Sequence, residues 1–71
     1  MKNGEITSLQ DVRLLLKRFG TFIYSGDPLL DLELMEEEIK ELFDSTLIEA
    51  KEYQMSILYL KKEMRKYENK S

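Results

Sequence analysis

The 71-residue chain contains no cysteine and no histidine. The absence of cysteine excludes disulfides, thiolate nucleophiles and cysteine-based metal sites. The absence of histidine removes the commonest metal ligand and the side chain whose unperturbed pKa lies closest to neutrality. The serine and threonine hydroxyls therefore have no histidine base to activate them as nucleophiles. We expect a protein that is not an enzyme and that carries neither a metal ion nor another cofactor.

Long apolar runs are also missing. No run approaches the roughly 20 residues that a membrane-spanning helix needs, and the residues after Met1 do not resemble a signal peptide. A small secreted domain of this length usually depends on disulfides. We therefore expect a cytoplasmic protein with no membrane association.

The few helix-breaking residues divide the chain into three segments. One break extends from Gly20 to Pro28, which is the only proline, and the other is Asp44-Ser45-Thr46. Hydrophobic residues make up 42% of the chain and charged residues 35%, a mixture that suits a helical globule. The sequence predicts an all-α, three-helix bundle with helices at about 8–19, 28–44 and 49–67, forming one domain over residues 1–71.

Capping residues support these boundaries. Ser8 is a good N-cap, and Asp11 follows three residues later in an arrangement resembling a capping box. Gly20 can adopt the left-handed conformation that ends a helix. Asp27 followed by Pro28 is a favourable start for the second helix. Between them, residues 21–24 read as an extended connector whose aromatic side chains we expect to cover one end of the core.

Each predicted helix has an apolar stripe at helical spacing. The expected core residues are Leu9, Val12, Leu16 and Phe19 in the first helix, Leu32, Met35, Ile39, Leu42 and Phe43 in the second, and Tyr53, Ile57, Leu60, Met64 and Tyr67 in the third.

Charge is distributed unevenly along the chain. The net charge is −3, and residues 27–45 contain eight acidic residues and one basic residue. A divalent cation needs oxygens that converge on it, whereas carboxylates on a straight helix point outward. The acidic residues of the second helix are therefore interpreted as a solvated surface, with Glu36 and Lys40 paired at the i, i+4 spacing.

The third helix carries large apolar residues outside its predicted core stripe. Met55, Leu58 and Tyr59 share that side with Lys62, Arg65 and Lys66. One interpretation is a nucleic-acid surface, because cations neutralise phosphates and a tyrosine can stack on an unpaired base. The other is that the apolar residues contact another protein, a second copy of the chain or the connector between the first two helices, with the basic residues acting as ordinary partners of the helix dipole. Composition alone favours the second interpretation.

The sequence also resembles the YqgQ-like family of small bacterial proteins. The resemblance covers residues 8–68, and Pro28 departs from it, because some relatives have a basic residue there. It lies mainly in the segment Arg18-Phe19-Gly20-Thr21-Phe22-Ile23-Tyr24-Ser25-Gly26-Asp27, and also in Leu32-Glu33-Leu34-Met35-Glu36, Leu47-Ile48 and Glu52-Tyr53-Gln54-Met55.

This resemblance implies a three-helix bundle that binds single-stranded DNA or RNA. Combined with the basic and aromatic residues of the chain, it predicts a site with phosphate contacts from cations and stacking by two tyrosines. The expected site residues are Arg13, Lys17, Arg18, Tyr24, Tyr59, Lys62, Arg65 and Lys66. The alternative is a protein–protein interaction module or a homodimer that associates through Met55, Leu58 and Tyr59.

Overall fold

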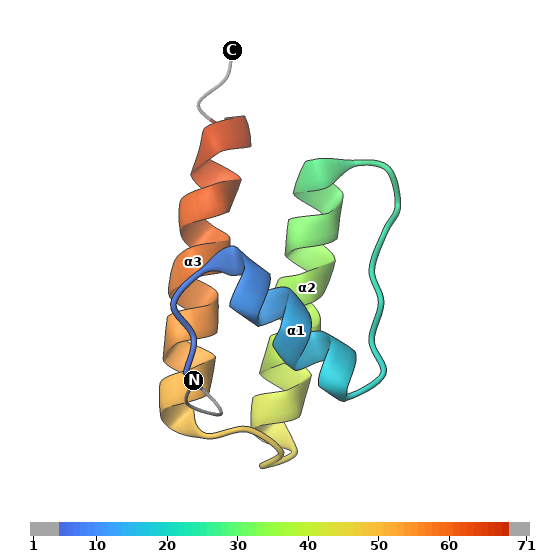
Figure 1. Cartoon of the computed structure of the whole chain (residues 1–71). Coiled ribbons are helices and arrows are strands. Elements are labelled where there is room, and N and C mark those ends of the chain that lie inside the picture. The colour runs from blue at the N-terminus through green and yellow to red at the C-terminus, as the bar shows by residue number, and fades with distance from the viewer. Residues whose placement is uncertain (1–4, 69–71) are drawn as a thin grey trace.

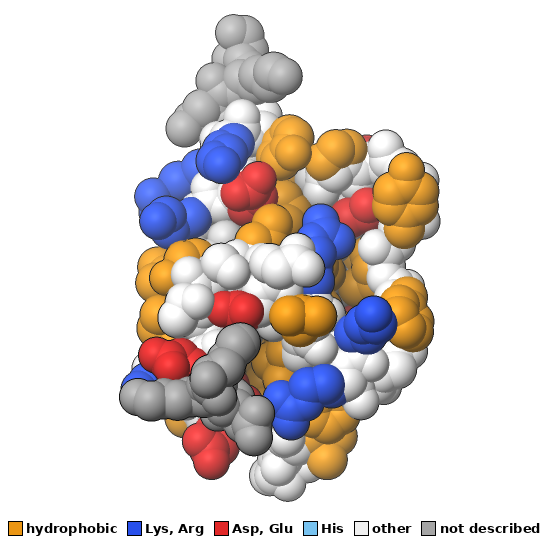
Figure 2. All heavy atoms as spheres, in the orientation of Figure 1, with side chains coloured by type: hydrophobic (Ala, Val, Ile, Leu, Met, Phe, Trp, Pro, Cys, Tyr) orange, Lys and Arg blue, Asp and Glu red, His pale blue; other side chains and the backbone are white. Residues whose placement is uncertain are grey.

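The computed structural model describes residues 5–68, which contain three helices. They are α1 (Leu9–Arg18), α2 (Pro28–Asp44) and α3 (Ala50–Glu68). Helices α2 and α3 run antiparallel, and α1 lies across both of them (Figure 1). Figure 2, in the same orientation, shows that side chains fill the space between the ribbons. The predicted all-α three-helix bundle is confirmed, with each helix end within one residue of its expected position.

The start of α1 confirms Ser8 as the N-cap, whereas Asp11 accepts hydrogen bonds from a different residue than a capping box predicts. The Ser8 hydroxyl accepts a hydrogen bond from the Asp11 N–H at 3.3 Å. The Asp11 carboxylate accepts from the Thr7 N–H at 2.9 Å and from the Thr7 hydroxyl at 2.7 Å, instead of from the N–H of Ser8 as in a capping box. The hydrogen bonds from Thr7, led by the one from its side chain, hold the pKa of Asp11 below its ordinary value.

The end of α1 has the predicted glycine in a left-handed conformation. Gly20 has φ +81°, and its N–H donates to the Lys17 carbonyl at 2.9 Å. The Thr21 N–H donates to the Leu16 carbonyl at 3.0 Å. These two bonds satisfy carbonyls that the helix itself leaves unpaired and turn the chain towards the connector.

The end of α2 uses the same geometry without a glycine. The Thr46 N–H donates to the Phe43 carbonyl at 2.9 Å, and the Leu47 N–H donates to the Leu42 carbonyl at 2.9 Å. The left-handed residue is Thr46, with φ +59°. A β-branched residue in this region is strained, since its Cβ crowds the following carbonyl.

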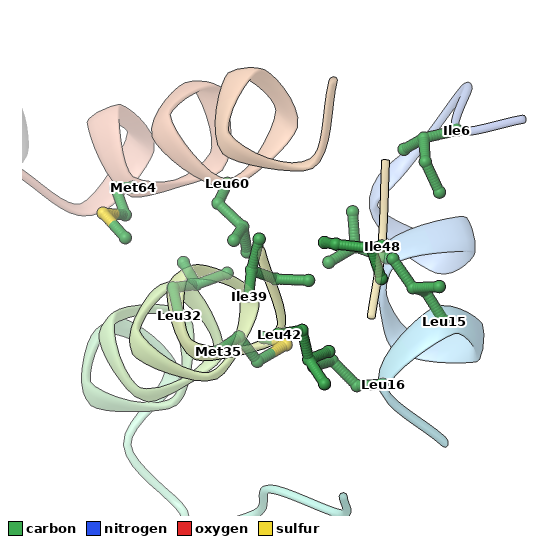
Figure 3. Packing of buried hydrophobic residues seen from close by; sticks show 11 residues of the cluster. Ile6, Leu15, Leu16, Leu32, Met35, Ile39, Leu42, Ile48, Leu60 and Met64 are labelled. Atoms are coloured by element: carbon green, nitrogen blue, oxygen red, sulfur yellow. The ribbon is translucent and has the colours of Figure 1, made fainter. Parts of the chain in front are cut away.

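The core lies where the three helices meet. Side chains from α1, α2, α3 and the α2–α3 loop converge there, with Ile48 of the loop on the α1 side (Figure 3). The buried hydrophobic residues are Ile6, Val12, Leu15, Leu16, Leu32, Met35, Ile39, Leu42, Ile48, Leu60 and Met64.

Two residues expected in the core lie at the surface. Phe19 follows the last residue of α1, so it leaves the helical stripe, and Leu15 is buried in its place. Tyr67 is in the last turn of α3, which projects beyond the start of α2 (Figure 1). Both predictions were wrong because periodicity reveals neither where a helix itself ends, as at Phe19, nor where the neighbouring helix ends, as at Tyr67.

Ser56 is a polar residue on the buried face of α3, which it shares with Leu60 and Met64. Its side chain is 0% exposed, and its hydroxyl oxygen has no hydrogen-bond partner among the described residues. A buried hydroxyl without a partner costs free energy on folding.

The helices of the described region, residues 5–68, include none that is both long enough and apolar enough to cross a membrane.

Candidate nucleic-acid interface

The connector between α1 and α2 displays two aromatic side chains to solvent. Successive side chains of an extended segment point to opposite sides. Thr21 and Ile23 are accordingly half-buried, whereas Phe22 is 75% exposed and Tyr24 is 91% exposed. The extended conformation was predicted correctly, but the expectation that these aromatics cover the core was wrong, because Ile23 packs against it instead.

Helix α2 anchors the connector at two points. The Thr21 hydroxyl donates to Glu38 Oε1 at 3.4 Å. Ser25 donates to Asp31 Oδ1 twice, from its N–H at 2.8 Å and from its hydroxyl at 2.6 Å. Asp31 is buried, and its two bonds with the exposed Ser25 are part-buried. Helix α2 therefore holds the backbone that carries Phe22 and Tyr24 at a point before them and a point after them.

Helix α2 itself begins where this anchor ends. Asp27 Oδ1 accepts from the N–H groups of Leu29 at 3.1 Å and Leu30 at 3.3 Å, which confirms the predicted cap. The end of the connector and the first turn of α2 are thus joined to each other by hydrogen bonds.

A pocket of about 380 Å³ lies between α1, the connector and α2. Leu16, Ile23 and Met35 contribute apolar lining that reaches the core. Further lining side chains are Gln10, Arg13, Leu14, Lys17, Thr21, Phe22 and Tyr24. The lining includes two cations and no carboxylate, although the chain as a whole is acidic.

The pocket brings together three of the predicted site residues. Arg13 and Lys17 are exposed residues of α1, four apart, and Tyr24 approaches from the connector. Arg18 is exposed at the last position of α1 and does not line the pocket. Among residues 5–68, neither Arg13 nor Lys17 has a carboxylate within ion-pair distance.

The other predicted residues lie along α3. Lys62 places its Nζ 5.7 Å from the ring centroid of Tyr59, a cation–π distance. Lys66 pairs with Glu63 at 3.2 Å, and Arg65 is exposed. Tyr59 is half-buried and packs against the core, so its ring is less accessible for stacking than that of Tyr24.

The apolar residues on this side of α3 are also less exposed than their spacing indicated. Met55 packs against the core together with Tyr59, whereas Leu58 is 48% exposed. Helix α3 contacts both α2 and α1. Helix α3 therefore buries a wider face than a single stripe predicts.

Lysine and arginine side chains form two groups in Figure 2, one over the C-terminal half of α3 and the other over α1 and its surroundings. Hydrophobic, acidic and uncharged side chains lie between the two groups on this face. The predicted site residues thus separate into two groups. The α1–connector group consists of Arg13, Lys17, Arg18 and Tyr24, and the α3 group consists of Tyr59, Lys62, Arg65 and Lys66.

Sequence reasoning missed Phe22, Leu14 and Gln10, which line the pocket beside the predicted residues. The signal for Phe22 was present, because side chains two apart in an extended segment point the same way and Tyr24 had already been selected. Gln10 lies three residues before Arg13 and four residues before Leu14, and these spacings place helical residues on one side.

The acidic surface of α2 shows no arrangement suited to a metal ion. Across residues 5–68, no group of three or more acidic residues is placed to hold one. Glu36 pairs with Lys61 of α3 at 3.2 Å, whereas the predicted pair with Lys40 is absent from the ion pairs of this region. Glu36 thus links α2 to α3.

The fold and the pocket define a small all-α protein with an extended, aromatic-bearing connector on one side of a three-helix bundle. The chain belongs to the YqgQ-like family, whose model matches residues 6–66. It is similar to the uncharacterized protein YqgQ of Bacillus subtilis (strain 168), with 36% identity over 64 residues that cover 90% of each chain. No solved structure matches the chain significantly.

Proposed function

We propose that this protein binds single-stranded nucleic acid at the pocket between α1 and the connector. The observation that carries the proposal is the exposure of Phe22 and Tyr24 beside two cations that have no carboxylate partner among the described residues. Proteins that bind single strands combine aromatic side chains, which stack on bases, with cations that follow the phosphates. Arg13 and Lys17 supply the cations here.

The anchored connector favours binding. An aromatic side chain on a loose loop must be ordered when it binds, and that ordering costs affinity. The bonds from Thr21 to Glu38 and from Ser25 to Asp31 fix the connector before a ligand arrives. Bases in a duplex are already stacked, so exposed aromatic rings favour unpaired strands.

The α3 group gives the strand a second region of positive charge. Lys62, Arg65 and Lys66 supply phosphate contacts for a strand long enough to reach from the pocket to α3. The exposed glutamates of α2, Glu33 and Glu37 among them, repel phosphates and restrict the strand to the α1 side of the bundle.

Fluorescence anisotropy with labelled oligonucleotides at low salt tests this proposal. We expect binding that weakens steadily as salt rises, because cation–phosphate contacts release counterions. Tyr24→Ala should weaken binding by about 1–3 kcal/mol if its ring stacks on a base, whereas Tyr24→Phe should retain the affinity. Lys17→Ala should reduce the salt dependence. Absence of any titration at tens of micromolar protein would end the proposal.

Lys51→Ala is a suitable control for Lys17→Ala. Lys51 is an exposed residue in the first turn of α3 and does not line the pocket. Both substitutions remove one positive charge, so a general effect of net charge would weaken binding equally. A loss specific to Lys17 would locate the strand at the pocket.

The alternative function is self-association or binding of another protein through α3. Its main support is Leu58, which is 48% exposed, since Met55 and Tyr59 pack against the core. Light scattering distinguishes the two functions, because a dimer through this surface should become monomeric in Leu58→Glu. An unchanged mass in that variant would exclude Leu58 from any dimer contact.

A further inference from the structure

The size of the pocket determines how much of a strand it can hold. Ligand pockets in proteins occupy about 300–1,000 Å³, and this one, at about 380 Å³, is near the lower limit. A space of this size suits one planar ring with its attached sugar and phosphate. It is too small for consecutive bases to lie inside it together.

The core residues and aromatic rings that line the pocket favour a flat apolar group. Leu16 and Met35 belong to the buried core, and both also line the pocket. Phe22 and Tyr24 extend from the connector at its side. An aromatic base that enters here contacts aliphatic groups and has two aromatic rings available for stacking.

Three polar side chains of the pocket are arranged along one side of α1, and Thr21 adds a hydroxyl from the connector. Gln10, Arg13 and Lys17 are spaced three and four residues apart, so they form a row beside the apolar lining. The two cations attract a phosphate, while the Gln10 amide can donate to and accept from the edge of a base. No carboxylate lines the pocket to oppose an anion.

We propose that this pocket is a subsite for a single nucleotide, and that a free nucleoside monophosphate is sufficient to occupy it. This inference rests on the proposed function and specifies which part of the ligand the α1–connector group recognises. The base lies against the apolar lining and the connector aromatics, and its phosphate lies beside Arg13 and Lys17. The α3 group then contacts only the continuing strand.

Two-dimensional amide NMR of the full chain, titrated with adenosine monophosphate or uridine monophosphate, tests this inference. We expect resonances of residues 10–24 to shift with saturation, while those of the α3 surface remain in place. Adenosine alone and inorganic phosphate alone should bind at least about tenfold more weakly, since each lacks half of the contacts. The monophosphate should also displace a labelled oligonucleotide.

Leu14→Glu is the most direct variant for this test. Leu14 lines the pocket but is 46% exposed, so the substitution introduces a carboxylate beside the phosphate position without removing a core residue. We expect it to weaken mononucleotide binding by about tenfold or more through charge repulsion. Leu47→Glu is the matched control, because Leu47 is comparably exposed in the α2–α3 loop, and it should leave binding unchanged.

The outcomes separate this inference from the proposed function. If oligonucleotides bind but saturating mononucleotide neither shifts the pocket resonances nor competes, the strand is bound elsewhere and the single-nucleotide subsite is refuted. If neither ligand binds, both proposals fail. An acidic peptide with an aromatic residue that occupies the pocket while mononucleotides do not would also overturn the inference. Equal losses in Leu14→Glu and Leu47→Glu would contradict the assignment to this pocket.

Discussion

Replacing Thr46 with glycine should stabilise the protein. Thr46 holds the left-handed position after α2, with φ +59°. A residue with a Cβ pays about 1–2 kcal/mol for this conformation, and glycine does not. Glycine loses more chain entropy on folding, by about 0.5–1 kcal/mol, which offsets part of the gain. The difference between these two ranges is about 0–1.5 kcal/mol, and its midpoint predicts that Thr46→Gly is stabilised by roughly 0.75 kcal/mol.

Thermal unfolding followed by far-ultraviolet circular dichroism measures this effect. In a domain of this length, a stabilisation of 1 kcal/mol raises Tm by about 4–8 °C, so the expected rise is a few degrees. Ser45→Gly is the matched control, since Ser45 has φ −86° and gains nothing from glycine. That variant should be destabilised by about 0.5–1 kcal/mol. If Thr46→Gly melts at or below the Tm of the parent chain, the strain argument is refuted.

Three further outcomes are expected. Asp31→Ala should lower the free energy of unfolding by about 2 kcal/mol and speed amide exchange in the connector, because Ser25 loses the acceptor of both its bonds. Asp31→Asn should lose less stability. Equal losses of the two variants in chemical denaturation would contradict this. Ser56→Ala should be neutral or stabilising by up to about 1 kcal/mol, since its hydroxyl has no partner among the described residues, and a clear loss of stability would reveal a bond to it. The lowered pKa of Asp11 stabilises the fold fully above the ordinary value of 3.8, and this contribution is lost as pH falls through the lower folded-state pKa, so Asp11→Asn should flatten the acid side of the stability profile.

Local signals were sufficient to predict the helices. Gly20 ends α1, and Asp27 with Pro28 begins α2, because these residues satisfy helix ends through their own backbone or side-chain chemistry. The helix-ending conformation at Thr46 was not predicted, because threonine carries no preference for it. Local chemistry thus predicted where the helices begin and end, although it did not predict the left-handed backbone conformation of Thr46.

The candidate site depended on contacts between distant segments, which the sequence pattern does not contain. The stripe on α3 gave no sign that α3 contacts α1 as well as α2, or that Met55 and Tyr59 pack against the core. The position of Asp31 held a usable signal, since it lies four residues before Met35 on the core side of α2. A buried acidic residue in such a row indicates a hydrogen-bond partner, here Ser25, which fixes the connector.

The pocket is assembled from a short stretch of the chain. All of its lining residues fall between Gln10 and Met35, and α3 contributes none of them. Substitutions on the outer side of α3 can therefore accumulate without changing the lining of the cavity, provided that the packing of α3 in the core is preserved. We therefore expect the pocket and the outer side of α3 to diverge at different rates among members of the YqgQ-like family.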